Sequence, residues 1–549
     1  MGATRQSLGT ERDEWSRRLL ASELTRRKLI SRAGLGGALL AMPNLLAACS
    51  SQSESSSTSG QEIETLEWGT TGIRALDYAH SFDVQTGVPL AVSVESLLTF
   101  DNDIQLQPLL AKSWSQPDPL NYVFELRTDV EFWDGTPLKP EDVVYSLERH
   151  MDPDVASEMN YLFSRVKSIK ETGPSQVTVA LSQPDPYFAY GQTFTSITPK
   201  AFTEELGDDF GRPGETVSTM GTGPYKITAF RADDLVTLER NEGYRGTPPP
   251  VKTINVKMFS DPQTMQLAMR SGEIDGTFQV PVPQVEQWRQ IEGTTVQSAA
   301  GMSVLALFFD VTQEPWSDIN VRRAIAYSFD REGVVESVLG GEAQVANSLV
   351  PPAQWASLLP EDEVAAFYDE LPRFTFDMEQ AAAALAESSV PDGFSASIEY
   401  PTIIAELGKA LLSLQANLKE INIELDVKEV SPNQWFAELQ AQSYPIGVVG
   451  YAPDYPDPAN YITSAYLPGN QAKYENTEVQ ALVEEQEKTT DPETRAPLIQ
   501  EVLRIAEPEL PFLPLWWANS VMSIIDDLAF ESFSPLWYNQ VWIQNLSSA

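Results

Sequence analysis

Cys49 is the only cysteine in this chain of 549 residues, and it lies close to the N-terminus. No internal disulfide bond can form, and no zinc or iron–sulfur centre can be built from several cysteines. A large domain does not need such crosslinks, because the fraction of surface that folding buries rises with chain length. The sequence therefore predicts that the long region after Cys49 is stabilised by apolar cores.

The residues before this cysteine have the order of an export signal. Arg26 and Arg27 form a twin-arginine pair, and residues 33–48 contain no charged side chain. This uncharged stretch is shorter than the ~20 apolar residues of a membrane span, and glycine and proline interrupt it. The sequence thus predicts a twin-arginine signal peptide over residues 1–48. The alternative is a buried N-terminal helix.

The end of the predicted signal explains the single thiol. Residues 46–49 read LAAC, which resembles a bacterial lipobox, where the cysteine sulfur receives a lipid and the cysteine becomes the mature N-terminus. Residues 50–61 contain seven serines and no apolar side chain, so they cannot contribute to a core. The sequence predicts lipidation of Cys49 and a flexible serine-rich tether over residues 49–61.

The balance of charges excludes some partners. The chain has 78 acidic and 37 basic side chains, which give a formal net charge of −41 at pH 7. Nucleic-acid phosphates and anionic lipid surfaces attract basic proteins, so neither is expected to bind this one directly. A strongly acidic surface favours solubility and attracts cationic ligands.

Local patterns predict both strands and helices. Apolar alternation predicts strands over residues 62–68, 122–126 and 176–181, with a loop at residues 69–72 after the first. A proline followed by two acidic residues predicts a helix over residues 140–149. The mixture along the chain indicates an α/β or α+β fold.

Further helices are predicted later in the chain. Apolar residues at helical spacing begin at Val321, and Asp330 is placed to cap a second helix that ends near Leu339. Thr477 begins a capping-box pattern, and the pair of residues 491–492, Asp-Pro, indicates another helix start.

Four segments resemble a known family. In chain order they are DPLNYVFELRTDVEFWDGTPLKPEDVVYSLERH (118–150), GTGPYKITAF (221–230), VRRAIAYSFDREGVV (321–335) and DYPDPANY (454–461). They resemble the bacterial extracytoplasmic solute-binding proteins of family 5, which serve ABC transporters for dipeptides, oligopeptides and nickel. The resemblance extends from about residue 62 to the end of the chain.

The resemblance implies an α/β fold of the two-lobe, periplasmic-binding-protein-like kind (type II, the large cluster C), with an inserted extra subdomain in lobe I. Lobe I is then expected over residues 62–310 plus 515–549, with the insertion at 97–220, and lobe II over residues 311–514. Two apolar runs, residues 305–309 and 512–517, lie at the expected crossings between the lobes.

The resemblance also implies a function. The protein is expected to be a monomeric, extracytoplasmic lipoprotein, anchored by its lipid to the outer face of the cell membrane. It would capture peptides between its lobes and deliver them to the permease subunits of an ABC importer, without a cofactor. An alternative is a receptor of the same family for a non-peptide solute, such as an oligosaccharide, an opine or a metal chelate.

An extracytoplasmic hydrolase is the third alternative, and the sequence gives it little support. His80 and His150 are the only histidines, and no His-x-x-x-His, Gly-x-Ser-x-Gly or phosphate-loop pattern is present. Acidic pairs are frequent only because the chain has so many acidic residues. We therefore expect neither an enzyme nor a metal site.

The ligand site is expected around Asp454. An apolar strand ends at Tyr451, and a proline-rich turn then carries Asp454 and Asp457. In peptide-binding relatives the aspartate at the position of Asp454 holds the α-amine of the ligand, a charge-assisted contact of about 1.5–3 kcal/mol. We expect Tyr451 to contact the ligand or to pack the strand end. Gly450 and the strand before it suit main-chain pairing with an extended peptide, whereas Asp457 is expected to be structural.

Other expected ligand contacts are weaker. Trp516 and Trp517 would face opposite sides of a strand, so Trp516 can line the cleft while the other packs in a core. Thr71 lies in a loop that often approaches the ligand in this family. In dipeptide-type relatives an arginine precedes the aspartate by about fifty residues, but residues 400–412 contain only Lys409 as a basic residue. Strict dipeptide specificity is therefore not expected.

Overall fold

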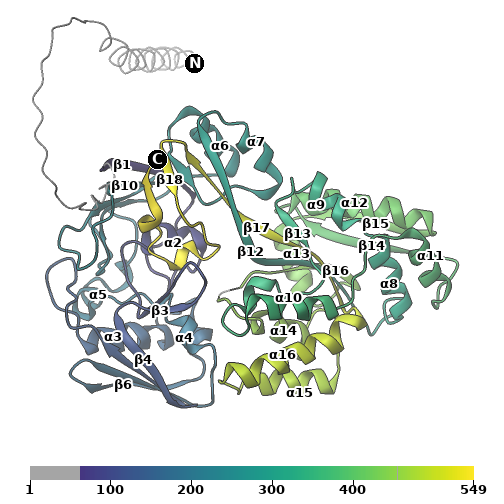
Figure 1. Ribbon diagram of the computed structural model, residues 1–549, viewed down its shortest axis with the longest axis horizontal. Helices are drawn as coiled ribbons and strands as arrows, with labels where there is room; N and C mark the ends of the chain where they lie inside the picture. Colours follow the sequence, from purple (N-terminus) through teal and green to yellow (C-terminus); the bar gives the residue numbers. More distant parts are fainter. Residues whose placement is uncertain (1–61, 454) are drawn as a thin grey trace, which may run out of the picture. The chain divides into compact units, whose positions relative to one another are not determined.

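The computed structural model describes residues 62–453 and 455–549. The predicted signal peptide, the tether, Arg26, Arg27, Cys49 and Asp454 lie outside the described residues. In the described part, helices and strands alternate throughout (Figure 1), and no helix there is both long and apolar enough to cross a bilayer.

A nine-stranded sheet dominates the described part of the chain. Its hydrogen-bonded order is β16 (Ile446–Tyr451), β12 (Thr294–Phe309), β17 (Phe512–Ile525), β11 (Gly276–Thr277), β1 (Ile63–Thr71), β10 (Val251–Phe259), β9 (Leu235–Arg240) and β8 (Tyr225–Arg231), and β13 (Ala343–Val345) pairs with β17. β1 is parallel to β10 and to β11, and the other pairs are antiparallel.

The first strand is longer than the sequence predicts. Gly69, Thr70 and Thr71 pair with residues 257–259 of β10, so the expected loop at residues 69–72 is mostly strand. That prediction was wrong because Gly69 was read as a strand terminator. A Cβ there would lie 2.6 Å from Cδ1 of Ile274, so any larger residue would force that side chain to move, and the glycine reflects close packing within the strand.

Residues 97–197 form a core of their own around a four-stranded antiparallel sheet. The sheet has the order β4 (Ala111–Asp118), β5 (Asn121–Leu126), β7 (Gln176–Leu181) and β6 (Val166–Gly173). Buried and partly exposed residues alternate strictly in β5 and β7, which confirms the two predicted strands. The predicted helix is α3 (Pro140–Glu148), with Pro140 in its first turn.

β12 and β17 form a long antiparallel pair that runs from the part of the sheet around β1 toward the helices of residues 319–506 (Figure 1). Both predicted apolar runs lie in this pair and are buried. Trp516 and Trp517 belong to different apolar cores, as expected for neighbouring residues of a strand.

The predicted later helices are present, with one difference. Asp330 caps α9 (Arg331–Ser337), and Asp491 caps α16 (Pro492–Ala506), each by accepting a hydrogen bond from a backbone N–H of the first turn. The capping box expected at Thr477 is wrong. Asn476 is the N-cap of α15 (Thr477–Gln486), because its side chain accepts hydrogen bonds from the N–H groups of residues 478 and 479.

The remaining elements complete the description. The helices are α2 (Val84–Leu90), α4 (Phe188–Gly191), α5 (Lys200–Leu206), α6 (Pro262–Ser271), α7 (Val285–Arg289), α8 (Ile319–Ser328), α10 (Glu361–Glu370), α11 (Met378–Ala386), α12 (Ala405–Glu420), α13 (Pro432–Gln440) and α14 (Ala459–Tyr466). The strands are β2 (Leu98–Phe100), β3 (Leu106–Pro108), β14 (Phe394–Pro401), β15 (Ile423–Val430), β18 (Leu528–Phe530) and β19 (Leu546–Ser548).

Candidate ligand-binding site

The strand that precedes residue 454 is held on one side by the long strand pair. In β16, Gly450 pairs with Leu305 of β12, and Leu305 pairs in turn with Trp516 of β17. Gly450 and Trp516 therefore lie two strands apart, about 9.6 Å, across the same sheet. The backbone at Gly450 is exposed, so the C-terminal end of β16 can pair with an extended ligand.

The turn that follows residue 454 is fixed by a buried ion pair. Asp457 is fully buried, and its two carboxylate oxygens accept hydrogen bonds from the guanidinium of Arg495 at 2.7 and 2.5 Å. The same carboxylate accepts a hydrogen bond at 2.9 Å from the N–H of Ala459 at the start of α14. This geometry confirms that Asp457 is structural.

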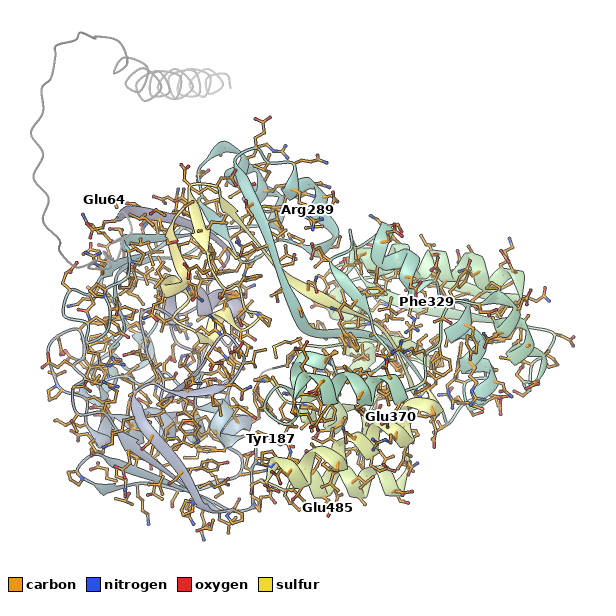
Figure 2. All side chains as sticks on the ribbon, in the orientation of Figure 1. Glu64, Tyr187, Arg289, Phe329, Glu370 and Glu485 are labelled. Carbon is orange, nitrogen blue, oxygen red and sulfur yellow. The ribbon has the colours of Figure 1, made fainter. Side chains whose placement is uncertain are left out.

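Tyr455 lies against two tyrosines of the segment that contains α4. Its ring is stacked with those of Tyr187 and Tyr190, with centroids 5.5 and 5.7 Å apart. The Arg495 guanidinium lies over the Tyr187 ring at 4.7 Å from its centroid. The Asp457–Arg495 pair and the tyrosine stack therefore form one continuous packed group. The label of Tyr187 in Figure 2 marks its position.

Polar contacts join the same two segments. The Tyr187 hydroxyl donates to Oε1 of Gln486 at 2.8 Å. Arg165 donates to Oε2 of Glu487 at 2.8 Å and to the backbone carbonyls of Glu487 and Pro184 at 3.1 and 3.0 Å. Residues 165–190 and 455–487 thus contact each other through an ion pair, hydrogen bonds and aromatic packing.

A cavity of about 300 Å³ lies between these segments, and we call it the side cavity. This volume is at the lower end of the range of small-molecule sites. Its lining includes apolar, aromatic, hydroxyl and charged side chains. They are Tyr161, Leu162, Ser164, Arg165, Asp185, Tyr187, Phe188, Gly191, Tyr455, Ala459, Asn460, Thr463, Ser464 and Glu487.

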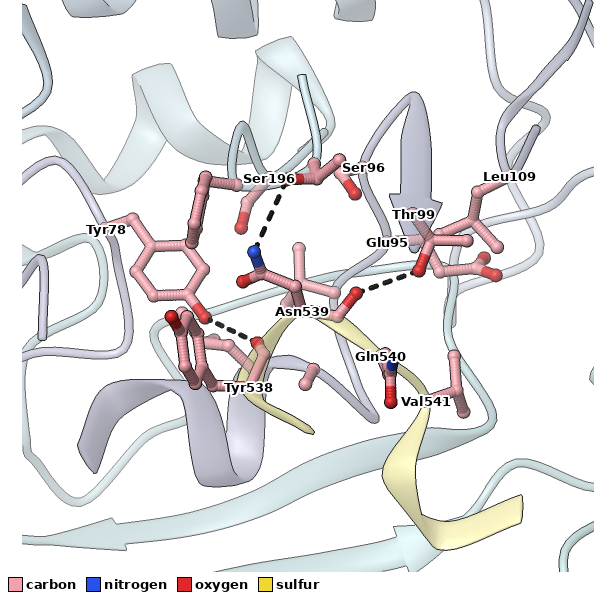
Figure 3. A pocket seen from close by; sticks show the side chains of 15 residues that line it. Tyr78, Glu95, Ser96, Thr99, Leu109, Ser196, Tyr538, Asn539, Gln540 and Val541 are labelled. Atoms are coloured by element: carbon pink, nitrogen blue, oxygen red, sulfur yellow. Dashed lines mark hydrogen bonds between the residues drawn. The ribbon is translucent and has the colours of Figure 1, made fainter. Parts of the chain in front are cut away.

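A second, much smaller cavity lies elsewhere and has a different character (Figure 3). It has about 20 Å³ of space, enough for roughly one water molecule. Its carboxylate, Glu95, is already bound by both terminal nitrogens of Arg245 at 2.6 and 2.7 Å. The Thr99 hydroxyl also donates a hydrogen bond to the backbone carbonyl of Asn539 in the wall of this cavity. This cavity does not fit a solute.

The other expected contact residues are placed as follows. Tyr451 is partly buried, with its ring 6.2 Å from Tyr461 and 6.4 Å from Phe512, and burial raises the pKa of its hydroxyl. Trp516 is 3% exposed and packs in an apolar core. Thr71 donates through its N–H and its hydroxyl to Oε1 of Gln279 at 3.0 and 3.3 Å.

Sequence reasoning missed the segment around α4. Asp185, Tyr187 and Tyr190 lie within the sequence PDPYFAY, 265 or more residues before Tyr455, and nothing local pairs them with it. The one local pattern that could have indicated a site in this segment is an acidic residue followed by two tyrosines in a proline-rich turn. No group of His, Cys, Asp or Glu side chains placed to hold a metal ion occurs in the described residues.

Comparison with known proteins decides the family. The model of the bacterial extracellular solute-binding proteins, family 5 (Middle), matches residues 105–473. The chain belongs to this family. Its members are the solute-binding components of ABC importers, which are transport proteins and not enzymes, and they act outside the cytoplasm.

Individual relatives are similar over most of their length. Heme-binding protein A of Haemophilus influenzae is 24% identical over 455 residues, which are 76% of this chain and 79% of the relative. The oligopeptide-binding protein OppA of Bacillus subtilis is 24% identical over 450 residues, 74% and 79% of the two chains. The solved structure of DppA from Helicobacter pylori, in complex with the peptide STSA, has a TM-score of 0.69 and 21% identity, covering 89% and 98%. These comparisons confirm the predicted α/β, two-lobe fold of the family 5 solute-binding proteins.

Proposed function

We propose that this family 5 protein captures peptides between its two lobes and delivers them to the permease of an ABC importer. The observation that carries the proposal is the construction of the turn at residues 455–458. A buried ion pair holds the turn, and Tyr455 contacts Tyr187 and Tyr190 from a segment more than 260 residues earlier. These contacts fix the turn that directly follows the proposed amine-binding position.

The lobe boundaries form part of this proposal. Lobe I comprises residues 62–310 and 515–549, with the inserted subdomain at 97–220, and lobe II comprises residues 311–514. The paired strands β12 and β17 support these boundaries, because the proposed lobe limits fall close to their ends. A hinge at paired strands allows closure of the kind known for periplasmic binding proteins.

Two features support a peptide as the solute. Asp454 supplies a carboxylate for an α-amine, and the exposed backbone at Gly450 offers main-chain pairing. We propose Tyr451, Trp516 and Thr71 as further contacts. Lys409 lies on α12, and no arginine is present in residues 400–412 to bind the carboxylate of a dipeptide. The proposal therefore favours peptides longer than two residues.

Attachment to the membrane is proposed from the sequence. Arg26 and Arg27 direct export, Cys49 carries the lipid, and the serine-rich tether lets a monomer work at the outer face of the membrane. A non-peptide solute is the second candidate. It is favoured by the similarity, at 24% identity, to a relative named as a heme-binding protein.

The test replaces Asp454 by Ala and compares free peptides with peptides acetylated at the α-amine, by calorimetric titration. We expect Asp454→Ala to weaken binding of the free peptide by about 2–4 kcal/mol, or about 30- to 1000-fold, because a charge-assisted bond is lost in a shielded site. Acetylation should weaken the wild-type protein similarly and hardly affect the variant. Asp392→Ala, which removes an exposed turn carboxylate, is the matched control.

The outcome separates the two candidates. If the acetylated peptide binds the wild-type protein as tightly as the free peptide does, Asp454 does not hold an amine. If no peptide binds, the non-peptide solute replaces the peptide as the proposed ligand, and mass spectrometry of ligand extracted from the purified protein would identify its class.

A further inference from the structure

Asp185 is a buried carboxylate in the wall of the side cavity. It lies in the turn between β7 and α4 and is 7% exposed. Its Oδ1 accepts a hydrogen bond from the N–H of Tyr187 at 3.0 Å, and its backbone carbonyl accepts one from the Tyr122 hydroxyl at 3.0 Å. No ion pair within residues 62–453 and 455–549 involves this side chain. Asp185 is therefore a buried carboxyl group that no basic side chain in the described residues binds directly.

Arg165 is the basic residue in the lining of the side cavity, and it already binds groups other than Asp185. The guanidinium of Arg165 donates hydrogen bonds to the Glu487 carboxylate and to the backbone carbonyls of Pro184 and Glu487. Burial raises the pKa of the Asp185 carboxyl, and the charge of Arg165 lowers it by less. Of the charged side chains that line the side cavity, Asp185 and Glu487 are negative and Arg165 is positive, which leaves one negative charge without compensation.

The rest of the lining matches a long side chain with a charged end. Leu162 and Phe188 provide apolar surface, and Asn460, Thr463 and Ser464 provide polar groups. Lysine and arginine place a hydrocarbon stem against apolar surface while the charged end meets polar or acidic groups. A cavity of about 300 Å³ has room for one such side chain.

We propose that the side cavity binds a cationic side chain of the ligand, of the lysine or arginine kind, with Asp185 as its counter-charge. This deepens the proposed function and rests on it, because Tyr455 in the cavity wall directly follows residue 454, the proposed amine-binding position. A residue near the N-terminus of a bound peptide would place its side chain there. The site then gives the receptor a preference for basic peptides, which the negative charge of the whole chain also attracts.

The experiment compares synthetic tripeptides on the full-length protein purified in detergent. Lys-Ala-Ala and Ala-Lys-Ala are titrated against the same peptides with norleucine in place of lysine, which keeps the stem and removes the charge. We expect the better lysine peptide to bind about 10- to 100-fold more tightly than its norleucine counterpart, as a charge-assisted contact requires.

Asp185→Asn is the decisive variant. The amide oxygen can still accept the hydrogen bond from the Tyr187 N–H, so the turn is preserved while the charge is lost. We expect the lysine preference to fall to about threefold or less, with the norleucine peptides bound as before. Unchanged norleucine binding shows that the variant is folded and that the side cavity is intact.

The possible failures differ. If the wild-type protein binds lysine and norleucine peptides equally, or if Asp185→Asn keeps the lysine preference, this inference is wrong while the peptide function stands. If none of the peptides binds the wild-type protein, the proposed peptide function fails, and the inference fails with it.

Discussion

Replacing Asp457 by Ala tests whether the buried ion pair holds the turn of the candidate site. The side chains of Asp457 and Arg495 are 0% and 3% exposed, so the variant leaves a guanidinium buried without its carboxylate. Burial by itself would lower the pKa of Arg495, but the charge and hydrogen bonds of Asp457, together with Tyr187 and Tyr190, raise it overall. Arg495 would keep only Oε1 of Gln486 at 3.1 Å and the face of Tyr187.

The magnitude follows from what is lost. Removing one partner of a buried ion pair costs about 3–5 kcal/mol. The variant also loses the hydrogen bond that Asp457 accepts from the N–H of Ala459, and such a bond contributes about 1 kcal/mol. We expect a total of about 4–6 kcal/mol. For a chain of this size the unfolding entropy is about 1 kcal/mol/K, which converts the loss to a fall in Tm of about 4–6 °C.

The assay is thermal and urea unfolding of the purified variants, with an exposed ion pair as the matched control. Asp369 in α10 pairs with Arg373, which lies three residues beyond the end of that helix. Their side chains are 76% and 58% exposed, and such pairs contribute about 0.5 kcal/mol or less. Asp369→Ala should therefore shift Tm by less than about 1 °C. Equal effects of Asp457→Ala and Asp369→Ala would refute the reasoning.

A double variant separates an unpaired charge from lost packing. Combining Asp457→Leu with Arg495→Met removes both charges and keeps apolar volume, and replacement of a whole buried pair is often neutral. We expect it to recover most of the stability that Asp457→Ala loses. Failure to recover any would mean that the polar contacts of the turn, and not the unpaired guanidinium, dominate the cost.

Two further predictions concern the anchor and the pH dependence of stability. Cys49→Ser should abolish the lipid mass and release the protein from the membrane fraction, and normal membrane retention of this variant would contradict lipidation at Cys49. Arg26→Lys combined with Arg27→Lys should block export, and normal export of this double variant would contradict the twin-arginine route. Burial raises the pKa of Glu507 from 4.5 to about 7, so the unfolded chain loses this proton before the folded one does and stability falls as the pH rises between these values. We expect Glu507→Gln to remove a fall of about 3 kcal/mol in the free energy of unfolding between pH 4.5 and 8, measured by urea titration; an identical pH profile for both proteins would contradict this.

Local signals in the sequence were sufficient for the individual elements. The alternation in residues 122–126 and 176–181 and the caps at Asp330 and Asp491 predicted elements that are present with nearly the expected ends. They succeed because strand periodicity and capping involve residues only a few positions apart. The errors at Gly69 and Thr477 arose where packing within a sheet, or a neighbouring Asn476, decided the boundary.

The sequence also determined the family, because its four ordered segments are local patterns, and it determined that Asp457 suits a turn. Only the tertiary structure decided which residues meet there. Arg495 binds Asp457 from α16, Tyr187 stacks on Tyr455, and Asp185 is buried beside a cavity that both segments line. These contacts join positions 38 to more than 260 residues apart, so no local periodicity encodes them. They depend on how whole segments pack, and packing is set by the shape and burial of many side chains at once.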